Sequence, residues 1–543
     1  MPSPAAAMTT FRKAFIAAIV KSLLRGKSLI QAILSYWIKP LGPNGSASKR
    51  KKASKSLQEF LKEAEAALLG PVSGDGLLQL SAGLKTQFFE RLQTDMECML
   101  PSYSHQLPTG GEAGQYLALD VGGSTLRVAL VELRGREAEE GKQSEIVSMR
   151  NFKIGKPIKD LEGMAFFDWM GERIQEVVSA GLNRGHSLEK PLPVALAWSF
   201  PIEQTSLGGG KLQRMGKAFL ADKGLLGEDL GEIVKQSCKK QGLNVELGAI
   251  LNDSSACLLS RAYSYTSTRF GLILGTGVNM AAYLPVLSIG RPKFGSRPIG
   301  WFSQASHVIV NTELGMFGHN ILPMTRWDHT LTKEHPRPDF QPLEHEVSGM
   351  YLGEIARLAL LEAIETTGML GGVVPASLKT SYSLGTDTLS MIEADTTPEL
   401  TEAIKLFSER HPSSHIPTTS DMLAIKAIAS FISIRSAAIV ATCVFTLWDC
   451  RLEAEAAYVS TLPESSPERL KVEADMKLEK TTVAFNGSVI ENYPRYLDTC
   501  QRYIDELVDS KGMAEPRSIQ LVPAKESSLM GAAVALACVE HDV

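Results

Sequence analysis

Residues 117–133, LALDVGGSTLRVALVEL, form two apolar runs with a short polar insert between them. The insert carries Asp120, two glycines, two hydroxyl residues and Arg127. Glycines allow a tight turn close to an anion, hydroxyl groups donate hydrogen bonds, and arginine neutralises phosphate. Asp120 can hold the water shell of a metal ion. The stretch therefore predicts two strands joined by a phosphate-binding turn, although a plain Gly-Gly hairpin has the same pattern.

The size and composition of the chain narrow its class. With 543 residues, the chain is too long for one compact core, which predicts two or more lobes. Its 44% apolar and 21% charged residues are typical of a folded globular protein. A net charge of −4 gives no reason to expect nucleic acid as a partner. The seven cysteines lack metal-ligand spacing and fit a reducing compartment, which favours the cytoplasm.

The first 55 residues differ from the rest of the chain in their charge. No acidic residue precedes Glu59, whereas basic residues recur from Arg12 to Lys55. The apolar stretches between them fall short of the roughly 18 residues that a membrane-spanning helix needs. We therefore interpret residues 1–55 as a basic apolar leader and linker, suited to attachment at an anionic membrane such as the mitochondrial outer membrane. A solvated extension is the alternative.

Helical and strand patterns alternate after the leader. Residues 56–70, SLQEFLKEAEAALLG, have helical spacing and begin with a possible capping box of Ser56 and Glu59. A second helix is predicted within residues 166–182, and the apolar run 193–200 predicts a strand. This alternation favours an α/β architecture.

Two further segments place polar groups at the ends of apolar runs. Residues 272–279, LILGTGVN, end in a Gly-Thr-Gly turn that repeats the phosphate-binding pattern, and a plain hairpin is again the alternative. Ser199, Asn311 and Glu313 also follow apolar runs, where they can bind sugar hydroxyls or merely cap strands.

Asn252 and Asp253 come directly after the apolar run of residues 249–251. A carboxylate at the end of a strand is well placed to accept a proton from a substrate hydroxyl. The alternative is structural, because Asp253 or Ser254 could serve as the N-cap of a following helix.

Taken together, these segments resemble the eukaryotic hexokinase family, and their order along the chain is the same. The matching segments are LALDVGGSTLRV, AWSFPIEQTS, LNDSSACLL, GLILGTGVNMAAY, NTELGMFG, LEHEVSGMYLGEIARLAL, VAFNGSVIENYPRY and ESSLMGAAVALA. The similarity runs from Glu59 to the C-terminus and excludes the leader.

The resemblance implies a fold and an activity. The fold is an α/β, actin-like (ribonuclease-H-like) pair of lobes around a central cleft. Residues 56–252 would form the N-terminal helices and the small lobe. Residues 253–543 would form the large lobe, with a C-terminal helix that returns toward the small lobe. The activity is ATP-dependent phosphorylation of a hexose at its C6 hydroxyl, with Mg²⁺ as the metal ion.

The resemblance also implies roles for individual residues. Asp253 would be the general base that takes the C6 hydroxyl proton, with Lys217 and Arg127 as further catalytic residues. The sugar would be held by Ser199, Lys217, Asn252, Asp253, Asn279, Glu313 and Glu344. The nucleotide would be held by Asp120, Gly122, Gly123, Ser124, Thr125, Arg127, Gly275, Thr276, Gly277, Gly487, Ser488 and Ser528. Mg²⁺ would have no direct protein ligand and would contact Asp120 through water.

One departure from the family pattern bears on the sugar. In MGKAF, Gly216 stands where glucose-phosphorylating members typically have a threonine that contacts the sugar. Losing a hydroxyl partner weakens discrimination between sugars and makes space beside the ring. N-acetylglucosamine is therefore an alternative substrate to a glucose-type hexose.

Other departures lie on the nucleotide side. The family's usual Thr-Asn, Asp-Gly-Ser and glycine-rich turns are replaced by Ser124-Thr125, Asn486-Gly487-Ser488 and SSLMG. Asparagine carries no charge, so ATP affinity could be lower. The rival hypothesis is a weakly active, hexokinase-like protein that regulates or senses sugar at a membrane.

Overall fold

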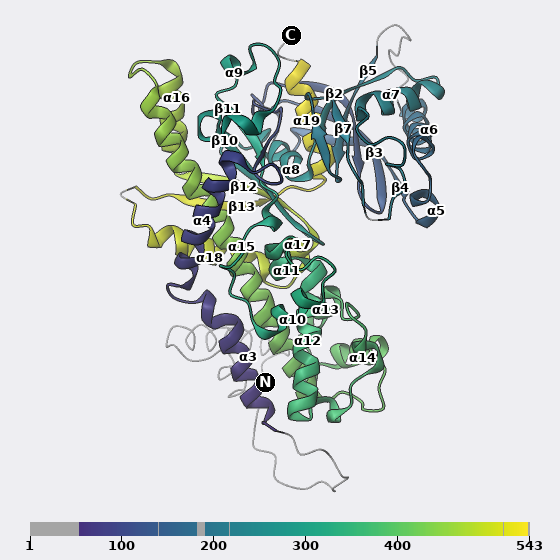
Figure 1. Ribbon diagram of the computed structural model, residues 1–543, viewed down its shortest axis with the longest axis vertical. Coiled ribbons are helices and arrows are strands. Elements are labelled where there is room, and N and C mark those ends of the chain that lie inside the picture. The colour runs from purple at the N-terminus through teal and green to yellow at the C-terminus, as the bar shows by residue number, and fades with distance from the viewer. Residues whose placement is uncertain (1–53, 140, 182–190, 217, 514, 541–543) are drawn as a thin grey trace, which may run out of the picture. The chain divides into compact units, whose positions relative to one another are not determined.

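The computed structural model describes residues 54–139, 141–181, 191–216, 218–513 and 515–540. Figure 1 shows the chain coloured from its N-terminus to its C-terminus. The predicted leader lies almost entirely outside the described residues, so its attachment to a membrane and its mitochondrial address stay predictions. Lys217 also lies outside them.

The chain divides into two compact units, and the first, which we name the helical unit, contains described residues 54–73, 323–331 and 352–435. These residues form helices and 3-10 turns, with no strand among those described. Besides parts of α10 (Arg326–Glu334), α12 (Gly349–Thr367) and α15 (Thr419–Thr461), the helices are α3 (Leu57–Leu69), α13 (Thr386–Ala394) and α14 (Thr401–Arg410). The predicted N-terminal helix is confirmed. Ser56 Oγ accepts a hydrogen bond from the Glu59 amide at 3.2 Å, and the Glu59 carboxylate accepts one from the Ser56 amide. These two bonds form the capping box.

The second unit, which we name the sheet unit, comprises Gly74–Leu322, Thr332–Tyr351 and Ser436–Val543. One of its sheets has five strands in the order β4 (Ser144–Lys153), β3 (Thr125–Arg134), β2 (Ala113–Val121), β5 (Leu192–Trp198) and β8 (Val245–Leu251). Strands β2, β5 and β8 are parallel, whereas β3 runs antiparallel to both of its neighbours. The predicted strand at residues 193–200 is confirmed as β5. The division of the chain at residues 55 and 252 stays a prediction.

The apolar character of strand β2 follows from burial of both faces of the sheet. Leu117 and Leu119 belong to an apolar cluster with α6 (Met164–Gly181) and α7 (Leu230–Lys240). Ala118, on the opposite face, belongs to a second cluster with α8 (Asp253–Ala262) and α19 (Ser527–Glu540). Because side chains alternate along a strand, Asp120 shares the face of Ala118. In Figure 1 the yellow C-terminal helix α19 lies beside α8 and β2.

The second sheet of the sheet unit has six strands in mixed orientation. Their order is β1 (Leu100–Pro101), β11 (His307–Asn311), β10 (Val278–Pro285), β9 (Thr268–Leu274), β12 (Lys480–Asn486) and β13 (Ser518–Pro523). Strands β9, β12 and β13 are parallel. A short hairpin pairs β6 (Ile202–Gln204) with β7 (Gly210–Leu212). The remaining helices of this unit include α4 (Gly76–Thr94), α5 (Lys156–Lys159), α9 (Trp301–Gln304), α11 (Pro342–Val347), α16 (Pro467–Met476), α17 (Ser488–Asn492) and α18 (Tyr496–Ser510). The predicted α/β architecture is confirmed.

Helix α15 is the one helix among the described residues that is long and apolar enough to cross a membrane. The most apolar part of this helix is 89% buried inside the protein. A core helix has this combination of length, composition and burial, so the helix gives weak evidence for a membrane span.

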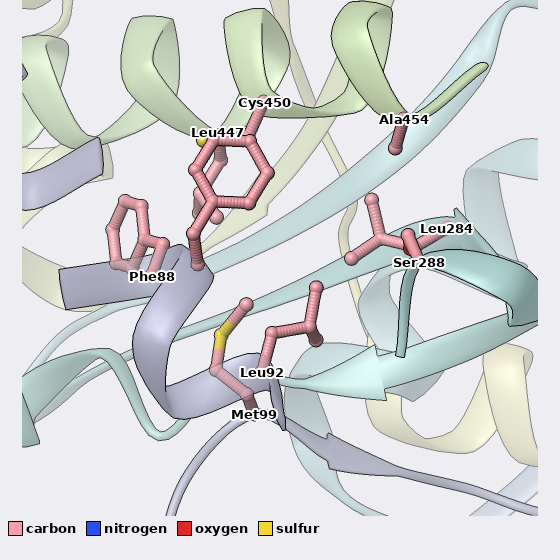
Figure 2. A pocket seen from close by; sticks show the side chains of 9 residues that line it. Phe88, Leu92, Met99, Leu284, Ser288, Leu447, Cys450 and Ala454 are labelled. Carbon is pink, nitrogen blue, oxygen red and sulfur yellow. The ribbon is translucent and has the colours of Figure 1, made fainter. Parts of the chain in front are cut away.

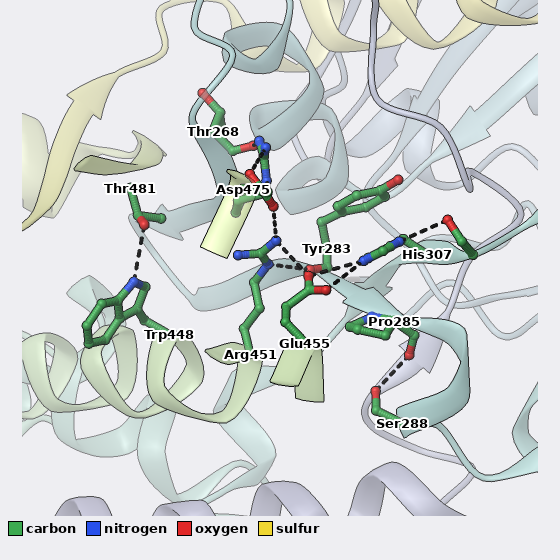
Figure 3. Close-up of polar contacts among 12 residues, drawn as sticks. Thr268, Tyr283, Pro285, Ser288, His307, Trp448, Arg451, Glu455, Asp475 and Thr481 are labelled. Carbon is green, nitrogen blue, oxygen red and sulfur yellow. Dashed lines mark hydrogen bonds and ion pairs between the residues drawn. The ribbon is translucent and has the colours of Figure 1, made fainter. Parts of the chain in front are cut away.

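A buried network of charges joins the six-stranded sheet to α15 and α16 (Figure 3). Arg451 lies between two carboxylates, at 2.7 Å from Glu455 and 2.5 Å from Asp475. His307 Nε2 of β11 lies 2.9 Å from the Glu455 carboxylate, and Arg451 Nε donates to the carbonyl of Tyr283 in β10 at 3.1 Å. The Glu455 and Arg451 side chains are 0% and 2% exposed, so water does not screen the pair.

Arg451 is the group that makes this burial of carboxylates tolerable. Burial alone would raise the pKa of Asp475, but the cations Arg451 and Arg269 outweigh it and hold that pKa below its usual value. Removing one partner of a buried pair costs more than the pair contributes, because the other partner is left uncompensated.

We expect Arg451→Met to destabilise the protein by about 3–5 kcal/mol, because it leaves the buried Glu455 and the partly buried Asp475 without their shared cation. Arg469→Met is the matched control, since Arg469 pairs with Glu473 at 2.7 Å on the partly exposed side of α16. The control should cost at most about 1 kcal/mol. Urea-unfolding midpoints of the two variants test the expectation, and equal shifts would contradict it.

Candidate active site

Predicted site residues of the first half of the chain lie at one edge of the five-stranded sheet, where its parallel strands have their carboxyl ends. The parallel strands β2, β5 and β8 have their carboxyl ends at this edge. The first turn (Gly122–Ser124) follows β2, Ser199 follows β5, and Asn252 follows β8. The Ser199 amide donates to the Val121 carbonyl at 3.2 Å, which places Ser199 beside the turn. Ligands of open α/β sheets bind outside the carboxyl ends of the strands, as this edge would allow.

Asp253 is the first residue of α8. Asn252 is the N-cap of this helix, because its side chain accepts hydrogen bonds from the Ser254 amide at 2.9 Å and the Ser254 hydroxyl at 2.7 Å. The alternative in which Asp253 or Ser254 is the N-cap is therefore wrong. Asp253 therefore lies at the amide end of α8.

A chain of amide side chains positions Glu313, which follows β11. Asn279 Nδ2 donates to Asn311 Oδ1 at 2.9 Å, and Asn311 Nδ2 donates to Glu313 Oε1 at 2.8 Å. Asn279 also lies 3.3 Å from Asn252 Oδ1, so the chain continues to the N-cap of α8. Glu313 has a left-handed backbone with φ 51°, which non-glycine residues rarely adopt. The sequence pattern placed Asn311 beside Glu313 but gave no sign that it links Asn279 to Glu313.

The charges of Asp253 and Glu344 both act on Glu313. Burial raises the pKa of Glu313, the hydrogen bond from Asn311 lowers it, and the charges of Asp253 and Glu344 raise it further. The net effect is a pKa above the usual value of a glutamate. Two of the predicted carboxylates thus influence the third.

Glu344 lies on α11, next to the turn Gly275–Gly277, which we name the second turn. The Val278 amide donates to Glu344 Oε2 at 3.0 Å. Just after α11, the amides of Gly349 and Met350 donate to the carbonyls of Gly275 and Thr276 at 2.8 and 3.1 Å. These hydrogen bonds therefore hold Glu344 and the second turn together.

The parallel strands of the six-stranded sheet bring the remaining predicted nucleotide residues to another shared edge. The turn Gly275–Gly277 follows β9, Gly487 and Ser488 follow β12, and Ser528 lies at the start of α19 after β13. Gly487 has φ +133°, and a Cβ there would lie 2.3 Å from the Leu274 carbonyl oxygen. Only glycine therefore fits where these two strand ends meet.

The first turn is a hairpin that carries an ion pair. Asp120 and Arg127 face each other across β2 and β3, and Arg127 Nε donates to Asp120 Oδ2 at 2.7 Å. The Gly122 amide donates to the Thr125 carbonyl at 3.0 Å, and neither Gly122 nor Gly123 has a positive φ. The Gly122 amide therefore closes the hairpin, and the role of this turn in binding phosphate stays a prediction. Burial raises the pKa of Asp120, although Arg127 acts against this shift.

Arg127 has a second carboxylate partner that the sequence patterns did not reveal. Its Nη1 donates to Glu526 Oε2, the residue just before α19. The two residues are 399 positions apart, so no local spacing could have indicated the pair.

The functional groups can be compared with what MgATP requires. Arg127, the hydroxyls of Ser124, Thr125 and Ser488, and the Asp120 carboxylate are groups that bind phosphate or a hydrated cation. Among the described residues, no cluster of three or more His, Cys, Asp or Glu side chains could ligate a metal ion directly. The Asp120 carboxylate and the hydroxyl groups are ligands that suit a hydrated Mg²⁺ ion.

Figure 2 shows a pocket elsewhere in the sheet unit, between α15 and α4. It is lined by Phe88, Phe89, Leu92, Met99, Leu284, Ser288, Leu447, Cys450 and Ala454. The Ser288 hydroxyl donates to the Pro285 carbonyl at 2.7 Å, so it is already satisfied. An apolar pocket of this kind offers nothing to recognise sugar hydroxyls.

Comparison with known proteins identifies the family. Two hexokinase family models match the chain, one over residues 61–263 and the other over residues 269–538. The chain is 28% identical to hexokinase-1 of Arabidopsis thaliana, over 84% of this chain and 85% of that protein. It is 30% identical to hexokinase-2 of Candida albicans, over 81% of this chain and 84% of that protein.

The fold agrees with these sequence matches. A Schistosoma mansoni hexokinase solved in complex with glucose superposes with a TM-score of 0.68, at 24% identity, over 89% of this chain and 100% of that one. The actin-like α/β fold with two mixed sheets is therefore confirmed. The chain belongs to the hexokinase family and is a hexokinase-type phosphotransferase.

Proposed function

We propose that this protein transfers the γ-phosphoryl group of ATP to the C6 hydroxyl of a hexose. The observation that carries the proposal is the hydrogen-bonded chain that runs from Asn252, beside Asp253, through Asn279 and Asn311 to Glu313. Glu344 is held at the second turn by the Val278 amide. Carboxylates suit a sugar because each accepts two or more hydroxyl hydrogen bonds. The family's general use of MgATP supports the choice of phosphoryl donor.

In the proposed reaction, Asp253 takes the proton of the C6 hydroxyl as the sugar oxygen attacks the γ-phosphorus. The bond to the β-phosphate oxygen breaks, and ADP leaves with that electron pair. Phosphoryl transfer depends on positioning and charge stabilisation more than on covalent catalysis, so one base and donor-rich turns suffice. Mg²⁺, when bound with ATP, would neutralise phosphate charge near Asp120.

The proposal assigns the other site residues by their position. Ser199, Lys217, Asn252, Asn279, Glu313 and Glu344 hold the sugar. Asp120, Gly122, Gly123, Ser124, Thr125, Arg127, Gly275, Thr276, Gly277, Gly487, Ser488 and Ser528 hold the nucleotide. Asn311 is added as a positioning residue, because it donates to Glu313 and accepts from Asn279.

The identity of the sugar depends on Gly216. This glycine has φ +66°, and a Cβ there would have no heavy atom within 4 Å. Threonine is poorly tolerated at such a φ, so the departure from the family pattern includes the backbone as well as a lost hydroxyl. The open space supports N-acetylglucosamine as an alternative substrate to a glucose-type hexose.

Asp253→Asn should lower kcat by about 10²- to 10⁴-fold, because an amide cannot take the hydroxyl proton. The matched control is Asp229→Asn, since Asp229 caps α7 and asparagine caps a helix equally well. A coupled assay of ADP release, with thermal melting to confirm folding, compares the two. Substantial turnover by a folded Asp253→Asn protein would refute the role of the base.

The pH dependence of sugar phosphorylation should show an acid limb set in part by Glu313. Because its pKa is raised, Glu313 loses its charge, and with it hydrogen-bond acceptors, as the pH falls through that raised pKa. The Asn311 hydrogen bond lowers this pKa, so Asn311→Ala should move the acid limb of kcat/KM for the sugar to higher pH. Asn492→Ala, on the exposed end of α17, should leave the limb in place. A limb that stays put or moves to lower pH in Asn311→Ala would contradict the assignment.

Gly216→Asn tests whether space at Gly216 sets sugar choice. Asparagine tolerates a positive φ, so the variant adds a side chain with little backbone strain. The ratio of kcat/KM for N-acetylglucosamine to that for glucose should fall by about tenfold. Gly224→Asn is the matched control, because Gly224 also has a positive φ, +78°, and open surroundings. An unchanged ratio would exclude Gly216 as the determinant.

A further inference from the structure

The guanidinium of Arg127 is shared by two carboxylates that differ in their exposure to solvent. Asp120 accepts hydrogen bonds from Nε and Nη2 on one side, and Glu526 accepts from Nη1 on the other, at 2.5 Å. The Asp120 side chain is 11% exposed, whereas that of Glu526 is 41% exposed. Asp120 is therefore fixed in the protein interior, and Glu526 is free to exchange its contact with water.

Glu526 is held in a conformation that its backbone does not favour. It has φ +50°, in the left-handed region that glycine tolerates and that glutamate rarely adopts. It lies between the end of β13 and the start of α19, at the same edge as Gly487 and Ser488. The contact between Glu526 and Arg127 thus links the first turn to the segment between β13 and α19.

The charges of this group oppose an incoming phosphate. One arginine faces two carboxylates, so the group carries a net negative charge when all three are ionised. Three hydrogen bonds from the guanidinium already serve the two carboxylates, so a phosphate group that binds Arg127 competes with them for its five N–H donors. Displacing the more exposed carboxylate, Glu526, costs less free energy than displacing Asp120.

We propose that Glu526 is a built-in counter-ion that occupies Arg127 before the nucleotide binds and is displaced by the nucleotide phosphates. This inference rests on the proposed function, which assigns Arg127 to the nucleotide. It makes Glu526 a determinant of nucleotide affinity that acts against binding. Asp120 keeps Arg127 in place during the exchange.

Removing the charge of Glu526 should tighten nucleotide binding. In the full chain, Glu526→Gln should lower the dissociation constant for MgADP and the KM for MgATP about two- to fivefold, the size expected of a half-exposed ion pair. The KM for the sugar should stay unchanged. Glu526→Asn, which suits the positive φ, should act in the same direction. Glu464→Gln, an exposed position with the same change of net charge, should change neither constant.

Isothermal titration calorimetry of MgADP and steady-state kinetics separate the possible outcomes. If the wild-type protein phosphorylates sugar and binds MgADP but the Glu526 variants bind it equally or more weakly, Glu526 is not a competitor and this inference alone is overturned. If the wild-type protein neither binds MgADP nor phosphorylates a sugar, the proposed function fails and this inference fails with it.

Discussion

The negative charge that surrounds the buried Glu313 is the constraint on which the rest of the site depends. Burial and the charges of Asp253 and Glu344 raise the pKa of Glu313. Each of these three carboxylates lies beside a neutral donor. The amide end of α8 lies at Asp253, the Asn311 side chain donates to Glu313, and the Val278 amide donates to Glu344. A sugar with several hydroxyl groups is a ligand that could satisfy the acceptors that remain.

In both sheets, predicted site residues lie where parallel strands end. Parallel strands end at one edge, so polar residues that follow separate strands meet there although they are far apart in sequence. Asp120, Ser199 and Asp253 meet in this way on the five-stranded sheet, and Gly275 and Gly487 on the six-stranded sheet. The buried network around Arg451 fixes strands β10 and β11, whose ends carry Asn279, Asn311 and Glu313.

Much of this arrangement could be predicted from the sequence, because apolar runs that stop at polar residues mark strand ends. The hairpin at Gly122, the capping box at Ser56 and the position of Asp253 after a strand all follow from local patterns. The residues that connect these parts could not be predicted. Whether Asn252 or Asp253 caps α8 depends on backbone geometry, and the pairing of Arg127 with Glu526 depends on the complete fold. Local spacing carries no information about such distant pairs.

Identification of the reaction product tests most directly whether this protein phosphorylates a hexose at C6. The full chain would be incubated with MgATP and glucose, and separately with MgATP and N-acetylglucosamine, while phosphorus NMR follows the reaction. We expect a sugar 6-phosphate and ADP to form in equal amounts for at least one of the two sugars. Formation of ADP without sugar phosphate, or a phosphate on another hydroxyl, would contradict this expectation.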